Sequence, residues 1–197
     1  MLQIDRTGAV ISDRIARNLF ANLEHGDMLA VRGIIVHQTG GSTAASALAS
    51  YRAVHADGAH FLIDKDGSIM QTASIRKQTY HVGKLKARCV LESRCTPGEQ
   101  AQLRTWDPAG LNRREALKQV PDRFPSNADA IGIELVGETV AQGGRQVYVA
   151  VTSEQNTSLA WLVGELEQTL NIATTEVFRH PEVSYKTDSE ASTARWR

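Results

Sequence analysis

Short and nearly uninterrupted apolar runs recur along the chain and predict a set of β-strands. Runs such as VRGIIV and IGIELV are too short for core helices and are typical of strands that are buried on both faces. The segments AHFLI and SIMQT flank DKDG, which predicts a hairpin with Gly67 as its turn residue. The predicted strands are residues 31–36, 59–63, 68–72, 131–136, 146–151 and 175–180, with the fifth antiparallel to the fourth.

Between these strands, the spacing of apolar residues predicts helices. Ser12 is a candidate N-cap for a first helix that would carry Ile15, Leu19 and Leu23 on one face. The sequence HQTGGST breaks the chain and starts a second helix that extends to about Val54. Because strand and helix patterns alternate along the chain, the fold class that they predict is α/β with a mixed sheet.

Two later segments add helices to this outline. Thr152 and Gln155 form a capping-box pattern in front of a helical stripe that ends at Leu170. Residues 84–128 hold both cysteines, the capping-box pattern TPGE and the helical pattern LNRREALKQ. We interpret 84–128 as a helical insertion within a single domain of residues 1–197. It either borders a substrate cleft or is a cap without a functional role.

Composition excludes several classes of protein. With 22 Lys and Arg against 22 Asp and Glu in 197 residues, the chain gives no indication of a nucleic-acid partner. No apolar run reaches membrane-spanning length, so we expect no membrane insertion. The N-terminus lacks a basic segment followed by an apolar one, so we expect no conventional signal peptide. Cys89 and Cys95 form either a small disulfide loop or two free thiols.

Several residues whose side chains could bind a metal or take part in catalysis lie at or within the apolar strands. His37 follows one predicted strand and His180 closes another, and sites in α/β sheets collect at the carboxyl edge. Lys186 and Asp188 alternate across one residue, so in an extended segment they would point the same way. Glu134 interrupts an apolar strand, where a carboxylate without a partner or a function is costly. Taken singly, each residue is more often structural or a surface ion pair.

Together, the motifs resemble one family. IIVHQTG, AHFLIDKDGSIMQ, YHVGK, DAIGIELVGE and HPEVSYKTD occur here in the order found in zinc-dependent N-acetylmuramoyl-L-alanine amidases. This superfamily includes phage lysozyme-type amidases, cytoplasmic anhydro-muropeptide amidases and peptidoglycan recognition proteins. The resemblance covers roughly residues 31–190. It implies a peptidoglycan recognition protein-like fold, with helices on both faces of a mixed central sheet. It also implies cleavage of the amide between MurNAc and L-alanine of the stem peptide.

The resemblance further implies roles for individual residues. The implied ligands of a catalytic Zn²⁺ are His37, His180 and Asp188, and a fourth position is left open for water. Glu134 would be the catalytic base and Lys186 a charge stabiliser beside the zinc. His81 would line the substrate groove, and His60 would lie on the substrate side or in the core. In the phage-type branch a tyrosine precedes the hairpin histidine. Here that residue is Ala59, which gives Glu134 more weight.

Other readings remain open at this stage. A chain with this fold could be a non-catalytic peptidoglycan-binding module, or the histidines could belong to an unrelated α/β protein. A type VI secretion effector delivered to the periplasm, with an immunity protein as a second partner, would need no signal peptide. Neither would a phage endolysin, nor a cytoplasmic recycling enzyme acting on muropeptides. The two cysteines favour an oxidising destination.

Overall fold

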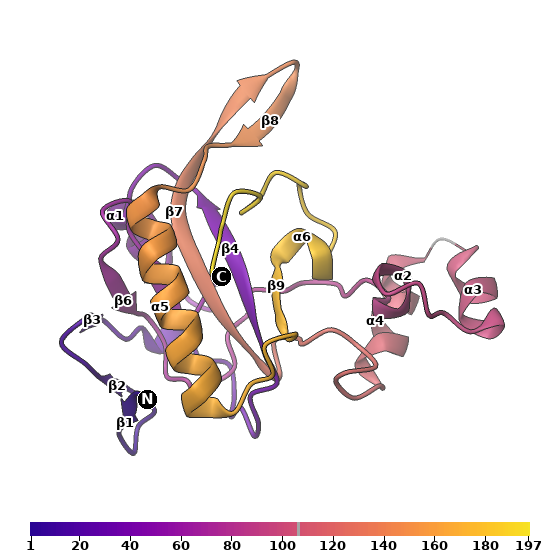
Figure 1. Cartoon of the computed structure of the whole chain (residues 1–197), viewed down its shortest axis with the longest axis horizontal. Helices are drawn as coiled ribbons and strands as arrows, with labels where there is room; N and C mark the ends of the chain where they lie inside the picture. Colours follow the sequence, from indigo (N-terminus) through magenta and orange to yellow (C-terminus); the bar gives the residue numbers. More distant parts are fainter. Residues whose placement is uncertain (106) are drawn as a thin grey trace.

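The computed structural model describes residues 1–105 and 107–197 and has a mixed β-sheet at its centre. The strand order is β3-β6-β5-β7-β4-β9, and β4 runs parallel to both of its neighbours. The strands of this sheet are β3 (Ile15–Arg17), β4 (Gly33–Gly40), β5 (Phe61–Ile63), β6 (Ile69–Gln71), β7 (Ala130–Gln142) and β9 (Val177–Arg179). The β7 strand continues beyond the body as a projecting ribbon with β8 (Arg145–Tyr148) (Figure 1). The predicted mixed sheet and hairpin are confirmed.

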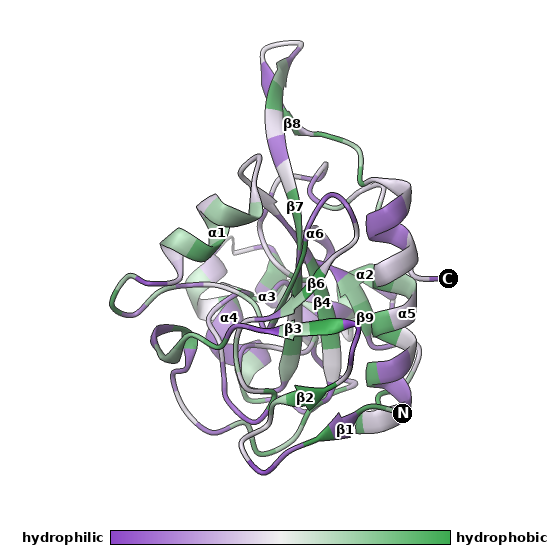
Figure 2. Cartoon of the chain, turned by 90° about the vertical axis from the view of Figure 1, so that its left-hand side faces the viewer, coloured by the Kyte–Doolittle hydropathy of each residue, from purple (hydrophilic) through white to green (hydrophobic). Residues whose placement is uncertain are grey.

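Alternation along the two central strands separates a core face from a site face. Successive side chains of a strand point to opposite faces of its sheet. In β4, Ile34 and Val36 join the largest apolar cluster, whereas Ile35 belongs to a different one. His37 has the parity of Ile35 and pairs in register with Glu134 of β7. The two polar side chains are therefore directed to the same face. Figure 2 shows the apolar colouring of the strands at the centre of the molecule.

Helices cover both faces of the sheet. The helix α5 (Ser153–Leu170) packs a stripe of buried residues against the core face, and Thr152 caps it as predicted. On the opposite face, Ala44 of α1 (Ala44–Ser50) packs against Leu62 and Val136. The α1 helix is shorter than predicted and ends before Tyr51. Across the described residues, no helix is both long and apolar enough to cross a membrane.

The N-terminal segment does not form the helix that its apolar spacing predicts. Its first residues form a separate hairpin of β1 (Gln3–Ile4) and β2 (Val10–Ile11), and β3 then pairs in parallel with β6. Backbone amides of Asn18 and Phe20 continue this pairing with the carbonyls of Gln71 and Thr72. A short 3-10 helix, η1 (Ala21–Leu23), follows. The open edge of the sheet offers this segment a ladder of backbone hydrogen bonds, which outweighs its local helical pattern.

The helices of residues 84–128 extend away from the sheet (Figure 1), and the sequence predicts the second and third of them but not the first. They are α2 (Arg88–Leu91), α3 (Pro97–Leu103) and α4 (Pro108–Ala116), with the predicted capping box at the start of α3. Cys89 and Cys95 form a disulfide. The Arg88 guanidinium donates two hydrogen bonds, of 2.7 and 2.8 Å, to the buried carboxylate of Glu176, the residue before β9. Breaking one partner of such a buried pair is costly, so this contact anchors the insertion.

Candidate metal centre and catalytic groove

A groove opens on the site face of the sheet, at the carboxyl end of β4. Its cavity has a volume of about 530 Å³. Its walls come from β4, β7, the loop around residues 80–83 and the segment after α6 (His180–Val183). Sequence-predicted residues that line it are His37, His81, Glu134, His180 and Lys186. The parallel pairing of β4 with both β7 and β9 brings residues that are far apart in sequence to one place.

Three buried side chains in this groove form a compact donor group. They are His37, His180 and Glu190, and one possible ligand atom from each lies within 4.8 Å of the others. Nδ1 of His180 is 2.9 Å from Oε1 of Glu190, and Nδ1 of His37 is 3.6 Å from the same oxygen. Two imidazoles and a carboxylate are a ligand set that zinc accepts.

Backbone carbonyls fix which nitrogen of each histidine faces this group. Nε2 of His180 lies 2.9 Å from the Val82 carbonyl and must donate a proton to it. Nε2 of His81 faces the Ala130 carbonyl at 3.3 Å, so Nδ1 of His81 accepts a hydrogen bond from Nε2 of His37 at 2.9 Å. Both histidines are thus held with Nδ1 directed at Glu190, and Nδ1 is the nitrogen that each would offer to a metal.

Charge also suits a cation at this point. Burial lowers the pKa of His37 to about 4, and the neighbouring His180 adds to that effect. Burial opposes ionisation of Glu190, but hydrogen bonds and charge interactions with His180 and His37 outweigh it and lower the pKa of Glu190 to about 2. At neutral pH an imidazole lone pair and a carboxylate therefore face each other, and a metal ion or a bound proton would satisfy both.

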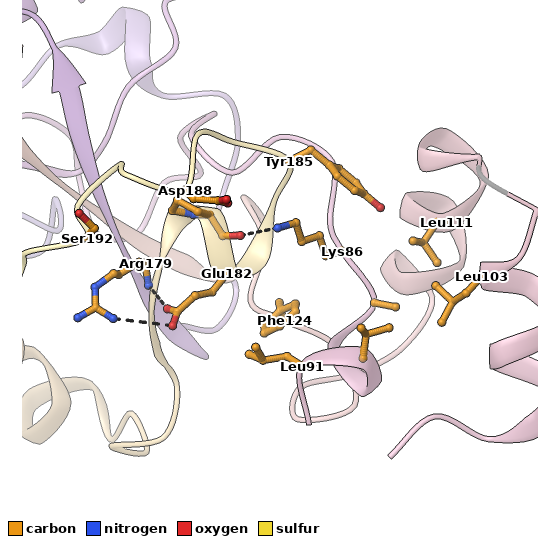
Figure 3. A pocket seen from close by; sticks show the side chains of 13 residues that line it. Lys86, Leu91, Leu103, Leu111, Phe124, Arg179, Glu182, Tyr185, Asp188 and Ser192 are labelled. Carbon is orange, nitrogen blue, oxygen red and sulfur yellow. Dashed lines mark hydrogen bonds and ion pairs between the residues drawn. The ribbon is translucent and has the colours of Figure 1, made fainter. Parts of the chain in front are cut away.

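Asp188, the third ligand that the resemblance implies, lies elsewhere. It is exposed and lines a second cavity of about 860 Å³ between α6 and the insertion (Figure 3). The chain turns after Thr187, whose carbonyl accepts the Glu190 amide. Lys186 therefore lines the groove, whereas Asp188 lines the second cavity. The expectation that the two side chains point the same way is wrong. In the structure Glu190, and not Asp188, lies beside His37 and His180.

Glu134 reaches the groove with one carboxylate oxygen already engaged. The hydroxyl of Tyr51 donates a hydrogen bond to Oε2 of Glu134. Burial raises the pKa of Glu134, and the bond from Tyr51 acts in the opposite direction. Tyr148 borders the same groove, and burial raises its pKa too. Sequence reasoning missed Tyr51 because nothing in the local pattern links the end of α1 to the middle of β7.

The other two predicted histidines have different roles. His60 is fully buried; its Nδ1 accepts the Gly132 amide at 3.0 Å and its Nε2 donates to the Lys77 carbonyl at 2.9 Å. Both ring nitrogens of His60 are thus committed to backbone atoms, so we assign it to the core and not to the substrate. His81 borders the groove, where it also supports His37.

Comparison with known proteins identifies a family that the chain matches. Residues 27–192 match the family described as N-acetylmuramoyl-L-alanine amidase. Similar solved structures include an AmpD derivative (18% identity, 94% of this chain and 91% of that chain, TM-score 0.57). Another is the endolysin LysCS from Clostridium intestinale (20% identity, 89% and 86%, TM-score 0.51). A third is AmpDh3 from Pseudomonas aeruginosa, in complex with an anhydromuramic pentapeptide (19% identity, 93% and 58%, TM-score 0.52).

A search of curated proteins returned no match. At the identities found, the structural likeness concerns the fold. The family match carries more weight, because it extends over most of the 197 residues and includes every residue of the donor group. The chain belongs to the N-acetylmuramoyl-L-alanine amidase family.

Proposed function

We propose that this protein is a zinc-dependent peptidoglycan amidase that hydrolyses the amide between MurNAc and L-alanine of the stem peptide. The observation that carries the proposal is the buried group of His37, His180 and Glu190, which shares an open groove with Glu134. The same arrangement in a chain of the amidase family favours catalysis over the alternative, a binding module of the same fold.

The residues that would hold zinc are His37, His180 and Glu190, with Glu190 replacing Asp188 in the set that the sequence implied. When bound, zinc supplies a Lewis acid for the substrate carbonyl and a water that is activated at neutral pH. The protein supplies the orientation of the ligands, because the Val82 and Ala130 carbonyls fix the histidine tautomers.

Two further side chains would handle protons and charge. The bond from Tyr51 to Oε2 of Glu134 leaves Oε1 to accept a proton from the attacking water. Glu134 would then pass that proton to the departing amine of L-alanine. Lys186, at the wall of the groove, would place its ammonium group near the negative charge that develops on the carbonyl oxygen.

Products define the reaction. Purified sacculi incubated with the protein should release stem peptides with a free L-alanine amino group and leave the glycan strands intact, as read by mass spectrometry. A chelator should stop the release and added zinc should restore it, because the group of His37, His180 and Glu190 would hold the metal that activates water.

Other products would contradict this assignment. Disaccharides would indicate a glycosidase, and fragments cut within the peptide would indicate an endopeptidase. A protein that sediments with sacculi and releases nothing would support the binding module. Soluble MurNAc-peptides should be included, because AmpDh3 was solved with an anhydromuramic pentapeptide and the substrate here is either such a muropeptide or polymeric peptidoglycan.

We propose that the protein acts in the cell envelope, as a secretion effector or a phage endolysin would. The Cys89–Cys95 disulfide supports this, because disulfides persist in oxidising compartments. Expressed in the bacterial cytosol, the protein should be tolerated, because polymeric peptidoglycan is out of reach. Fused to an export signal, it should lyse the cells, as followed by culture turbidity.

The His37→Ala variant provides the control for that experiment, since it should be exported without lysis. An exported and folded wild type that harms no cell, yet cleaves soluble muropeptides, would support cytoplasmic recycling instead. If the protein is an effector, its producer should carry an immunity protein, and co-expression of that partner in the periplasm should prevent lysis.

A further inference from the structure

The hydroxyl of Tyr51 reaches Glu134, a residue of the groove, from a position deep in the fold. Tyr51 directly follows α1, and only 2% of its surface is exposed. Its ring packs in a buried apolar cluster with Leu23 and Ala56, and it meets Phe20 edge to face at a centroid distance of 5.7 Å. The hydroxyl at the end of this ring donates to Oε2 of Glu134.

The neighbouring residues leave the Tyr51 ring room for only one position. A Cβ atom added at Gly58 would lie 2.5 Å from Cε1 of Tyr51, so only glycine at residue 58 leaves room for this ring. The hydrogen bond to Glu134 holds the end of the ring. The ring is thus held on its sides and at its tip, and the hydroxyl is fixed relative to β7.

We propose that Tyr51 is a positioning residue for Glu134. Its hydroxyl holds Oε2 so that Oε1 is free to face the attacking water, and this role rests on the proposed amidase function. A glutamate side chain without such a partner has several rotamers of similar energy, and only some of them direct an oxygen into the groove. Restricting a catalytic group to a productive orientation raises the rate of the chemical step.

The N-terminal segment also supports the Tyr51 ring. Phe20 and Leu23 precede residue 27, where the match to the amidase family begins. They pack against the Tyr51 ring, so a segment outside the family match supports the carboxylate in the groove. The segment thereby contributes to the reaction through Tyr51, without itself contacting Glu134.

Replacing Tyr51 with phenylalanine removes the hydroxyl and keeps the ring. With a soluble MurNAc-peptide as substrate, kcat should fall about 10–100-fold, which is the change that corresponds to one hydrogen bond to a charged group. KM should change less than about twofold, and zinc content and the melting temperature should stay near those of the wild type. Tyr185→Phe is the matched control, because Tyr185 lines the second cavity and not the groove. It should leave kcat unchanged.

A double-mutant cycle separates positioning from a general structural effect. In the Glu134→Gln background, Tyr51→Phe should lower kcat by less than about twofold further. An equal loss in both backgrounds would overturn the role, as would a Tyr51→Phe enzyme with full kcat. A wild type without amidase activity would instead overturn the proposed function, and this role with it.

A second measurement needs no variant at Tyr51, in case that variant folds poorly. Proton NMR of the wild type should show a slowly exchanging tyrosine hydroxyl resonance, because the group is buried and hydrogen-bonded. Glu134→Gln should shift this resonance, and His81→Ala should leave it in place. If no such proton exists, or if Glu134→Gln does not shift it, the contact is absent in solution and the proposal is wrong.

Discussion

Glu190→Ala is expected to yield a folded protein that binds no zinc and has no measurable amidase activity. Glu190 is the carboxylate that faces Nδ1 of both His37 and His180, so its removal leaves two nitrogen ligands. The loss of zinc affinity should exceed the roughly 10–100-fold change that follows loss of a partner outside the ligand set. Zinc content by elemental analysis and competition with a chromogenic chelator would measure it.

Asp188→Ala is the matched control for that experiment. Asp188 lies two residues away and lines the other cavity, so this variant should keep both zinc and activity. His180→Ala should behave like Glu190→Ala. The reverse pattern, in which Asp188→Ala loses zinc and Glu190→Ala retains it, would mean that the loop after Lys186 rearranges when metal binds and that the sequence pattern names the correct ligand.

Glu134→Gln should retain zinc and lower kcat by roughly 10²–10⁴-fold, the usual contribution of a positioned general base. The amide of glutamine keeps the size of the side chain and can still accept the Tyr51 hydroxyl, but it cannot take a proton from water. Steady-state kinetics on a soluble MurNAc-peptide, with zinc content measured on the same samples, would test this.

Glu138→Gln controls for a change of charge on the same strand. Glu138 is four residues along β7 and pairs with Lys65 at 2.5 Å. Its variant should change kcat by less than about twofold. If Glu134→Gln keeps wild-type kcat, or if it unfolds the protein without a specific effect on the rate, then Glu134 is a structural carboxylate and the base is another residue.

The sheet was predictable because its signals are local. The runs at 31–36 and 131–136 carry apolar residues on both faces, and the hairpin around Gly67 has a turn residue with φ of +85°. Thr152 with Gln155 also forms a complete capping box. The strand β3, which stands where the sequence predicts a first helix, was not predictable in the same way. Its pairing with β6 joins Ile15 to Ile69, which are far apart in the sequence, and leaves no trace in the local spacing.

The part of the site that lies on the strands or at their ends was predictable. His37, Glu134 and His180 come from three adjacent strands or strand ends, and the sheet brings them together. The position of Glu190, the proposed third ligand, depends on a turn of the chain after Thr187, whose direction the sequence does not specify. The position of the Tyr51 side chain depends on how the chain after α1 packs against the N-terminal segment. This packing is a tertiary contact that local sequence patterns do not encode.

The hydrogen bonds that hold the two histidines have a consequence for how this sequence can change. Their final acceptors are the carbonyls of Val82 and Ala130, and every amino acid carries a carbonyl. Replacing either side chain by another apolar one would alter packing and still present the same acceptor. The orientation of the imidazoles is therefore a property of the main-chain path. We therefore expect conservative substitutions at positions 82 and 130 to leave the orientation of the two imidazoles unchanged, and side-chain patterns alone will not reveal this support.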